Sequence, residues 1–120
     1  SELMVIKKKK PLPKKVHRVY CTYFDDGKYY IGYSCKTDKL FEKYFGSSTY
    51  VTNYEGEMRK EVVAEYAGKS HAKAVEHILQ WEHRFDDRCI NDMWNVRLRL
   101  SHLKELKLPD WRPGCFSQPS

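Results

Sequence analysis

Apolar and polar residues alternate along two neighbouring segments near the start of the chain, and apolar residues recur at helical spacing in two later segments. Residues 16–24 and 28–34 alternate around a turn sequence at 25–27, so they predict a β-hairpin. Residues 58–68 predict a third, largely buried strand. Helices are predicted at 37–46 and 70–85, from apolar side chains at Leu40, Phe41, Tyr44 and Phe45, and at Ala72, Val75, Ile78, Leu79 and Phe85. The order β-β-α-β-α indicates a small α+β domain, with a three-stranded, mainly antiparallel sheet flanked by helices.

Capping residues and turn formers set the expected ends of these elements. Thr37 or Asp38 is expected to cap the first helix and Gly46 to end it, and Ser70 is expected to cap the second helix. Residues 47–57 are rich in turn formers and predict a loop.

The chain divides into three regions. We expect a basic arm, one folded domain, and a short C-terminal helix with a loose tail, at 1–15 (with 1–3 interpreted as a tag remnant), 16–100 and 101–120. Two tryptophans are expected in the core and one in packing of the tail: Trp81 and Trp94, and Trp111.

The length of the hairpin loop determines which side chains share a face. A two-residue turn would mix apolar and polar side chains, whereas a three-residue loop separates them and puts Gly27 where positive φ is needed. One face then carries Val19, Cys21, Tyr23, Tyr29, Ile31 and Tyr33, and the other carries Arg18, Tyr20, Thr22, Tyr30, Gly32 and Ser34. We therefore expect half of these tyrosines in the core. Tyr20 and Tyr30 are expected side by side on the polar face, next to Gly32, where the backbone can approach a ligand closely.

The net charge of +6 in this chain of 120 residues is concentrated at its start. Residues 1–18 hold seven basic side chains against one acidic one, and the remainder holds fifteen of each. The prolines of this segment favour an extended, solvated arm that would bind a polyanion by neutralising phosphates, without reading sequence. A solubilising terminus is the alternative interpretation. The residues predicted to bind DNA are Lys7, Lys8, Lys9, Lys10, Lys14, Lys15 and Arg18.

The cysteines and histidines show no metal-binding spacing. Cys21, Cys35, Cys89 and Cys115 form no CxxC motif and the five histidines are scattered, so we expect reduced thiols and neither a zinc site nor a histidine metal site. No apolar run approaches about 18 residues, so no membrane partner is expected.

Four motifs, in order along the chain, resemble those of the GIY-YIG nuclease family. They are Val19-Tyr20, Tyr30-Ile31-Gly32, the helix sequence HAKAVEHIL around Glu76, and NDMWN ending at Asn95. The segment YIGYSCKTDKLFEKYFGSS is similar to the phage-type homing endonuclease branch. The resemblance covers roughly residues 16–97 and implies the family's β-β-α-β-α domain. It also implies a DNA endonuclease that hydrolyses phosphodiester bonds with Mg²⁺, or with Mn²⁺ in its place. Such an enzyme is expected in the cytoplasm, which is that of the host cell if the chain is phage-encoded.

The resemblance also assigns catalytic roles. It implies Tyr20 as general base or water positioner, and Tyr30 as its hydrogen-bonding partner. It implies Glu76 as the sole protein carboxylate on the metal ion, and Asn95 as a brace for Glu76 or for a water. Glu82 is the alternative ligand if the helix is rotated, because it falls near the apolar centre of the helical wheel, where an unpaired charge is costly.

The chain departs from the family at the first helix, which usually carries an arginine that stabilises phosphate charge. Tyr44 stands at that position, so Lys43, Lys39 or Lys36 would have to supply the charge, as a point donor rather than a bidentate fork. The predicted substrate contacts are Lys28, Gly32, Lys36 and Lys39. Two acidic residues of the third strand are interpreted as surface charges, Glu61 and Glu65.

Three functions are consistent with the sequence. The first is the DNA endonuclease, whose sequence selectivity would come from the domain itself, a homodimer or a partner protein. The second is a catalytically weakened nucleic-acid-binding module on the same scaffold, in view of the missing arginine. The third is a protein-interaction domain whose arm contacts an acidic partner, and this leaves the tyrosine-rich face unexplained.

Overall fold

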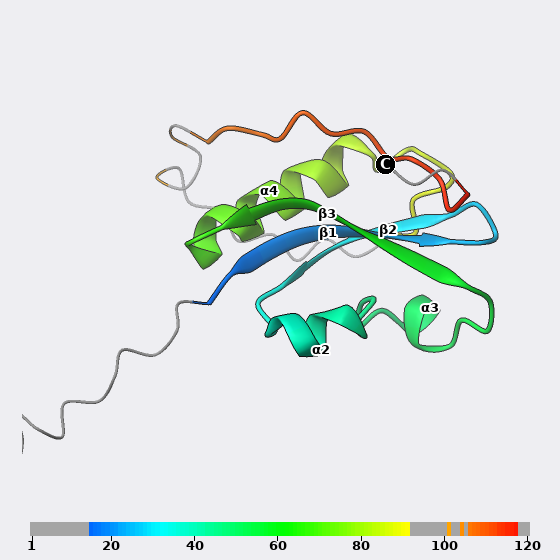
Figure 1. Cartoon of the computed structure of the whole chain (residues 1–120). Helices are drawn as coiled ribbons and strands as arrows, with labels where there is room; N and C mark the ends of the chain where they lie inside the picture. Colours follow the sequence, from blue (N-terminus) through cyan, green and yellow to red (C-terminus); the bar gives the residue numbers. More distant parts are fainter. Residues whose placement is uncertain (1–14, 92–100, 102–103, 105, 118–120) are drawn as a thin grey trace, which may run out of the picture.

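The computed structural model describes residues 15–91, 101, 104 and 106–117. In this part the elements are β1 (His17–Phe24), β2 (Tyr29–Ser34), α2 (Asp38–Glu42), α3 (Thr49–Thr52), β3 (Met58–Tyr66) and α4 (Lys69–Glu82) (Figure 1). The strands form one antiparallel sheet in the order β2-β1-β3. The predicted α+β class and three-stranded sheet are confirmed. The arm up to residue 14 and most of the predicted C-terminal helix lie outside the described residues.

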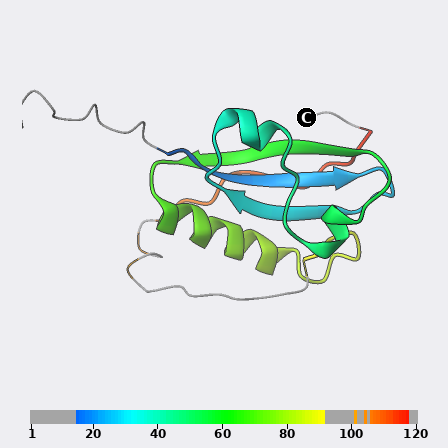
Figure 2. The ribbon, with the colours of Figure 1, turned by 90° about the horizontal axis from the view of Figure 1, so that it is seen from below.

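The sheet has helices on both faces. Figures 1 and 2 show α4 on one side of the sheet, and α2 and α3 on the other. On the α4 side, Ala72, Val75 and Leu79 pack against the apolar residues of the hairpin, including Val19, Cys21 and Ile31. No helix in the described part of the chain has both the length and the apolar character needed to cross a membrane.

The hairpin has the predicted register. Cys21 pairs with Ile31 and Tyr23 with Tyr29, and Gly27 ends the three-residue loop with φ of 95°. The face expected to be polar differs from the prediction, because it too is buried. Tyr20, Thr22 and Phe24 on this face are almost inaccessible to solvent, since rings from the segment 41–54 cover them.

The predicted loop at 47–57 contains the short helix α3. Ser48 caps this helix by accepting a hydrogen bond from Val51 N. Tyr50 and Tyr54 pack edge-on against Phe24, and their hydroxyl groups donate to the hairpin-loop carboxylates of Asp26 and Asp25. A four-residue helix is too short to show periodicity, so the pattern of the sequence predicted only a loop here.

Both predicted helices are shorter than expected. Thr37, one of the two caps predicted, caps α2, but the helix ends at Glu42. The helix α4 begins at Lys69 with Gly68 as N-cap, so the prediction that Ser70 caps it is wrong. It ends at Glu82, and the predicted core residues Trp81 and Phe85 are 57% and 84% exposed.

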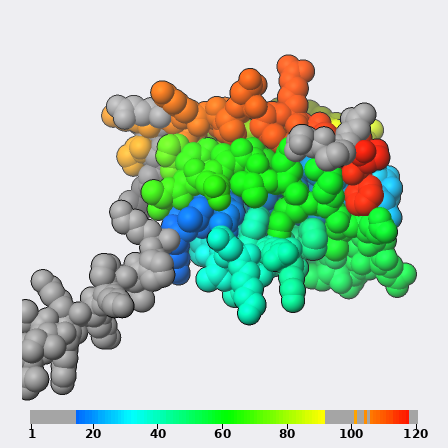
Figure 3. Space-filling view, in the orientation of Figure 1, coloured from blue at the N-terminus to red at the C-terminus, as the bar shows by residue number. Residues whose placement is uncertain are grey.

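The C-terminal segment 106–117 is docked rather than loose. Trp111 Nε1 donates to Glu61 Oε1 at 2.7 Å, and the Tyr23 hydroxyl donates to the same oxygen at 2.7 Å. The Tyr23 hydroxyl also accepts a hydrogen bond from Gly114 N at 2.9 Å. The orange and red atoms in Figure 3 show this segment lying against the molecule. The interpretation of Glu61 as a surface charge is therefore wrong, because it anchors this segment to β3.

Removal of the Trp111 side chain should destabilise the protein. The change Trp111→Ala deletes a half-buried ring and one hydrogen bond to Glu61, so the free energy of unfolding should fall by about 2–3 kcal/mol in urea denaturation. The control Arg112→Ala changes an exposed neighbour and should shift it by less than about 0.5 kcal/mol. Equal effects of the two changes would contradict the docking.

Candidate active site

A cleft lies beside β2, between α4 and the segment that enters α3. Its volume is about 640 Å³. The sheet order leaves β2 at an edge, so side chains rather than a further strand line this side. The lining residues that matter for its chemistry are Tyr30 from β2, Ser48 from the N-terminal cap of α3, Lys73, Glu76 and His77 from α4, and Asn91 from the segment after α4.

The carboxylate of Glu76 is the most unusual polar group of the cleft. It is only 7% exposed because α4 turns the neighbouring Val75 and Leu79 into the core. Its Oε1 atom is buried and forms an ion pair with Lys73 Nζ at 3.2 Å, but accepts no further hydrogen bond. A buried carboxylate is costly unless it is paired, hydrogen-bonded or bound to a metal. Glu82, the alternative ligand, is exposed and is not part of this cleft.

Tyr30 and Tyr20 lie side by side, as predicted, but only Tyr30 lines the cleft. Their ring centroids are 6.4 Å apart. Burial, followed by the negative charge of Glu76, raises the pKa of Tyr30 to about 12. Tyr20 is 1% exposed, and burial, with Tyr44 and Tyr30 nearby, raises its pKa further above the ordinary value. Burial of the Tyr20 hydroxyl thus favours its protonated form in the free protein.

Gly32 makes room for the side chain of Tyr20. A Cβ atom on Gly32 would lie 2.5 Å from the Tyr20 hydroxyl oxygen and 2.9 Å from Tyr30 Cε2. The space expected for a substrate is thus filled by the protein itself. Gly46 does the same for Tyr30, since a Cβ there would lie 2.8 Å from Tyr30 Cε2, and its φ of 136° favours glycine.

The lysines predicted to contact substrate lie outside the cleft. Lys28, Lys36, Lys39 and Lys43 are all exposed, and none of them lines it. Lys36 Nζ instead lies 4.7 Å from the centroid of the Tyr44 ring, and Lys28 Nζ lies 5.7 Å from that of Tyr50. Tyr44, at the position of the expected arginine, packs edge-on against Tyr20 at 6.0 Å. The cation that does lie in the cleft is Lys73.

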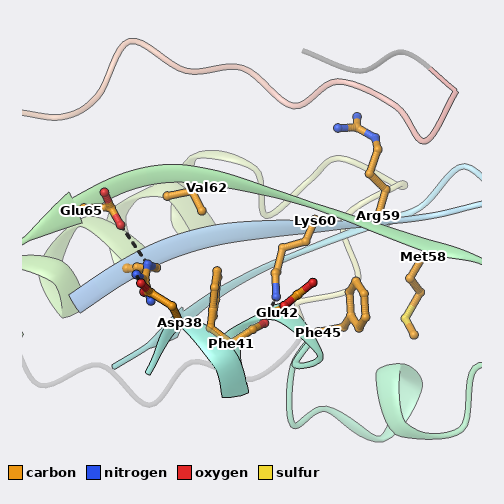
Figure 4. A pocket seen from close by; sticks show the side chains of 10 residues that line it. Asp38, Phe41, Glu42, Phe45, Met58, Arg59, Lys60, Val62 and Glu65 are labelled. Atoms are coloured by element: carbon orange, nitrogen blue, oxygen red, sulfur yellow. Dashed lines mark hydrogen bonds and ion pairs between the residues drawn. The ribbon is translucent and has the colours of Figure 1, made fainter. Parts of the chain in front are cut away.

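Arg18 belongs to the fold rather than to the basic arm. It is buried in a second groove, between α2 and β3, where it forms ion pairs with Asp38 and Glu65 (Figure 4). In the same groove, the Lys60 amine donates to the carbonyl oxygens of Phe41 and Tyr44. Burial lowers the pKa of Lys60 to about 8. These contacts fix α2 against the sheet, and with it the Tyr44 ring against Tyr20. Of the predicted arm, the structure describes only Lys15 besides Arg18, and Lys15 is exposed.

Four of these cleft residues were not predicted, namely Ser48, Lys73, His77 and Asn91. Asn91 Oδ1 accepts from Ile31 N at 2.8 Å, and Asn91 Nδ2 donates to Ile31 O at 2.9 Å, so this amide replaces a strand neighbour. Gln80 Nε2 also donates to Ile31 O, at 3.0 Å. The only sequence signal for Lys73 is its spacing of three residues from Glu76 on a helix. Asn95, the predicted brace, lies outside the described residues, and Asn91 lies four residues before it.

The donor set fits a hard cation bound largely by water. No cluster of three or more histidine, cysteine, aspartate or glutamate side chains occurs within the described residues. The four cysteines are free thiols. A single buried carboxylate suits Mg²⁺, which keeps several waters and often takes only one or two protein carboxylates, once Lys73 has moved away from Glu76 Oε1.

Comparisons with known proteins identified no similar protein. No protein-family model matches the chain, and neither the curated proteins nor the solved structures contain a match. The function is therefore inferred from the geometry and from the motifs of the sequence.

The contact between Tyr20 and Gly32 can be measured by a double-mutant cycle. The change Gly32→Ala should lower the free energy of unfolding by about 2 kcal/mol, because the new methyl group overlaps the Tyr20 ring. In a Tyr20→Ala background the same change should cost about 1 kcal/mol less, since the overlap with Tyr20 is gone and only the contact with Tyr30 Cε2 at 2.9 Å remains. Urea denaturation of the four proteins gives the coupling energy. A cost independent of the residue at position 20 would contradict this geometry.

Proposed function

We propose that the protein is a metal-dependent DNA endonuclease that hydrolyses phosphodiester bonds and is related to the GIY-YIG nucleases. The observation that carries this proposal is the position of Glu76. Its buried carboxylate, which forms an ion pair with Lys73 at 3.2 Å, lines the same cleft as Tyr30. The motifs of the sequence single out these two residues separately. A cytoplasmic location would follow from access to DNA.

Glu76 would hold a Mg²⁺ or Mn²⁺ ion, with water and a substrate phosphate as the other ligands. When bound, such an ion polarises a phosphoryl oxygen and lowers the pKa of a coordinated water. The roles of the protein side chains follow from their positions. Lys73 would leave Glu76 and neutralise phosphate charge. The protonated hydroxyl of Tyr30 would donate a hydrogen bond to the substrate or orient a water.

Tyr20 would be a positioning residue rather than a catalytic one. It is buried, keeps its proton and packs beside Tyr30 over Gly32. Its contribution would be to fix the orientation of Tyr30, because the Tyr20 ring leaves the neighbouring ring little freedom. This role replaces the general-base role that the resemblance implied.

The basic arm would supply affinity for DNA without sequence selectivity. Of its residues, Lys15 is exposed immediately before β1. Selectivity would have to come from the domain, a second copy or a partner protein. The affinity should fall steeply with salt, because each neutralised phosphate releases counterions.

A second candidate function is nucleic-acid binding without catalysis on the same scaffold. Two observations favour it. The Tyr20 hydroxyl is shielded from solvent, and no arginine of the described residues lines the cleft. A point charge from Lys73 stabilises phosphate less specifically than a bidentate guanidinium does.

Cleavage of supercoiled plasmid tests the proposal. With Mg²⁺ we expect nicked or linear product, abolished by EDTA. The isosteric change Glu76→Gln should reduce the rate by at least about 100-fold, because it removes the ligand charge. The control Glu82→Gln, an exposed carboxylate on the same helix, should leave the rate within about twofold. Cleavage that survives Glu76→Gln would refute the site, and DNA that is bound but intact would favour the second candidate.

The role of Lys73 can be tested with a matched lysine on the same helix. At saturating DNA and Mg²⁺, Lys73→Ala should slow cleavage by about 10- to 100-fold, because no other cation of the described cleft can stabilise the phosphate charge. Lys73→Arg should recover most of the rate. Lys69→Ala removes an exposed lysine one turn earlier and should have little effect. Equal losses from Lys69→Ala and Lys73→Ala would mean that Lys73 contributes only general charge.

A further inference from the structure

The ammonium group of Lys73 has two neighbours at the wall of the cleft. Its Nζ atom lies 3.2 Å from Glu76 Oε1 and 5.1 Å from the centroid of the Tyr33 ring. A distance of up to about 6 Å between an ammonium group and a ring centroid is typical of a cation–π contact. The Tyr33 ring is therefore a second anchor for Lys73, beside the carboxylate.

The Tyr33 ring is fixed by contacts with β1. Tyr33 pairs with Val19 in the sheet and packs, half-buried, against the core on the α4 side. The Tyr33 hydroxyl oxygen lies 2.7 Å from His17 Nδ1, in a hydrogen bond. The two rings are also stacked, with their centroids 5.9 Å apart and their planes 8° apart. The orientation of the ring thus does not depend on Lys73.

The Tyr33 ring is also uncharged. Burial, followed by the Cys35 thiol and the Glu76 carboxylate, raises the pKa of Tyr33, so the phenol keeps its proton. A carboxylate at this place would cancel the charge of the ammonium group. A neutral ring instead attracts the ammonium group through its π-face and leaves the positive charge available to a phosphate.

A second anchor is needed when a cation binds to Glu76. The bound cation takes the carboxylate that Lys73 neutralises in the free protein, and it repels the ammonium group. A lysine side chain has a flexible four-carbon stem and loses much rotamer freedom when it is fixed. Without the ring, Lys73 would spread over many positions, most of them away from a phosphate at the metal ion.

We propose that Tyr33 is the positioning residue for Lys73, and that its ring keeps the ammonium group at the cleft wall when a cation occupies Glu76. The N–H groups that Glu76 releases can then donate to a substrate phosphate. The inference rests on the proposed function, because it concerns how the same site stabilises phosphate charge.

Proton NMR of the Lys73 side chain tests its position without cleavage. Protons over the face of an aromatic ring are shifted upfield, so the Lys73 Hε signals should lie upfield of those of other lysines. The shift should persist with Mg²⁺, and also in Glu76→Gln, which releases Lys73 without a metal ion. Tyr33→Leu should abolish the shift and Tyr33→Phe should retain it. The control Tyr66→Leu changes another half-buried tyrosine, which stacks on His71, and should leave the shift unchanged.

Plasmid cleavage at saturating DNA and Mg²⁺ tests the consequence for the reaction. Tyr33→Leu should slow cleavage by about 3- to 30-fold, as expected for one lost cation–π contact, and Tyr33→Phe should stay within about twofold because it keeps the ring. In a Lys73→Ala background, Tyr33→Leu should change the rate by less than about twofold, because no ammonium group is left to position. Tyr66→Leu should leave the rate within about twofold.

Three results would overturn the positioning role. They are loss of the upfield shift in Glu76→Gln or with Mg²⁺, an equal rate loss from Tyr33→Leu with and without Lys73, and an equal rate loss from Tyr33→Phe and Tyr33→Leu. If the plasmid is cut but the shift disappears in Glu76→Gln, the endonuclease stands and the positioning role fails. If the plasmid stays uncut while the shift persists in Glu76→Gln and depends on Tyr33, the contact is supported and the endonuclease is contradicted.

Discussion

Burial of β1 on both faces is the constraint on which the other features depend, because a central strand between two helical layers has to fill space on each side. The chain meets this constraint with tyrosines. Tyr23 and Tyr29 face α4, and their hydroxyl groups donate to Glu61 and Asp86. Tyr20 fills the opposite layer over Gly32. A tyrosine ring provides apolar area for the core, and its hydroxyl reaches a polar partner at the margin. This explains why a hairpin of a small protein is built from tyrosines rather than from aliphatic residues.

The same arrangement creates the cleft. Tyr20 occupies the space over Gly32, so Tyr30 lies beside it and lines the cleft. At the outer edge of β2, Tyr29 pairs with the backbone of residues 88–90 in an isolated parallel bridge, and the side chains of Gln80 and Asn91 bind the backbone of Ile31. The backbone groups of Ile31 at this edge are therefore hydrogen-bonded, although no further strand runs along the whole length of β2. Because α4 packs on the sheet, Glu76 lies at this edge, where its carboxylate is buried beside the cleft.

The hairpin register was predictable because the alternation of side chains and Gly27 both require a three-residue loop. The long helix α4 was predictable from its periodicity. The helix α3 was not, because four residues carry no period, and neither was the docking of Trp111, which depends on a contact with Glu61 fifty residues away. Of the cleft residues, Tyr30 and Glu76 were predicted from the sequence motifs. Apart from the helical spacing of Lys73 from Glu76, the positions of Lys73, His77 and Asn91 carry no signal in the sequence, because only tertiary packing brings their side chains to one cavity. Trp81 was wrongly predicted in the core because an amphipathic pattern does not show at which residue a helix extends beyond the core.

The central claim is that one carboxylate in the cleft binds a divalent cation. Paramagnetic broadening of amide NMR signals by Mn²⁺, without DNA, tests this most directly because it reports position independently of activity. Broadening centred on Tyr30, Glu76 and His77, and lost in the Glu76→Gln variant, is the predicted result. Broadening centred instead on the acidic hairpin loop at Asp25 and Asp26, or unchanged by Glu76→Gln, would contradict the account.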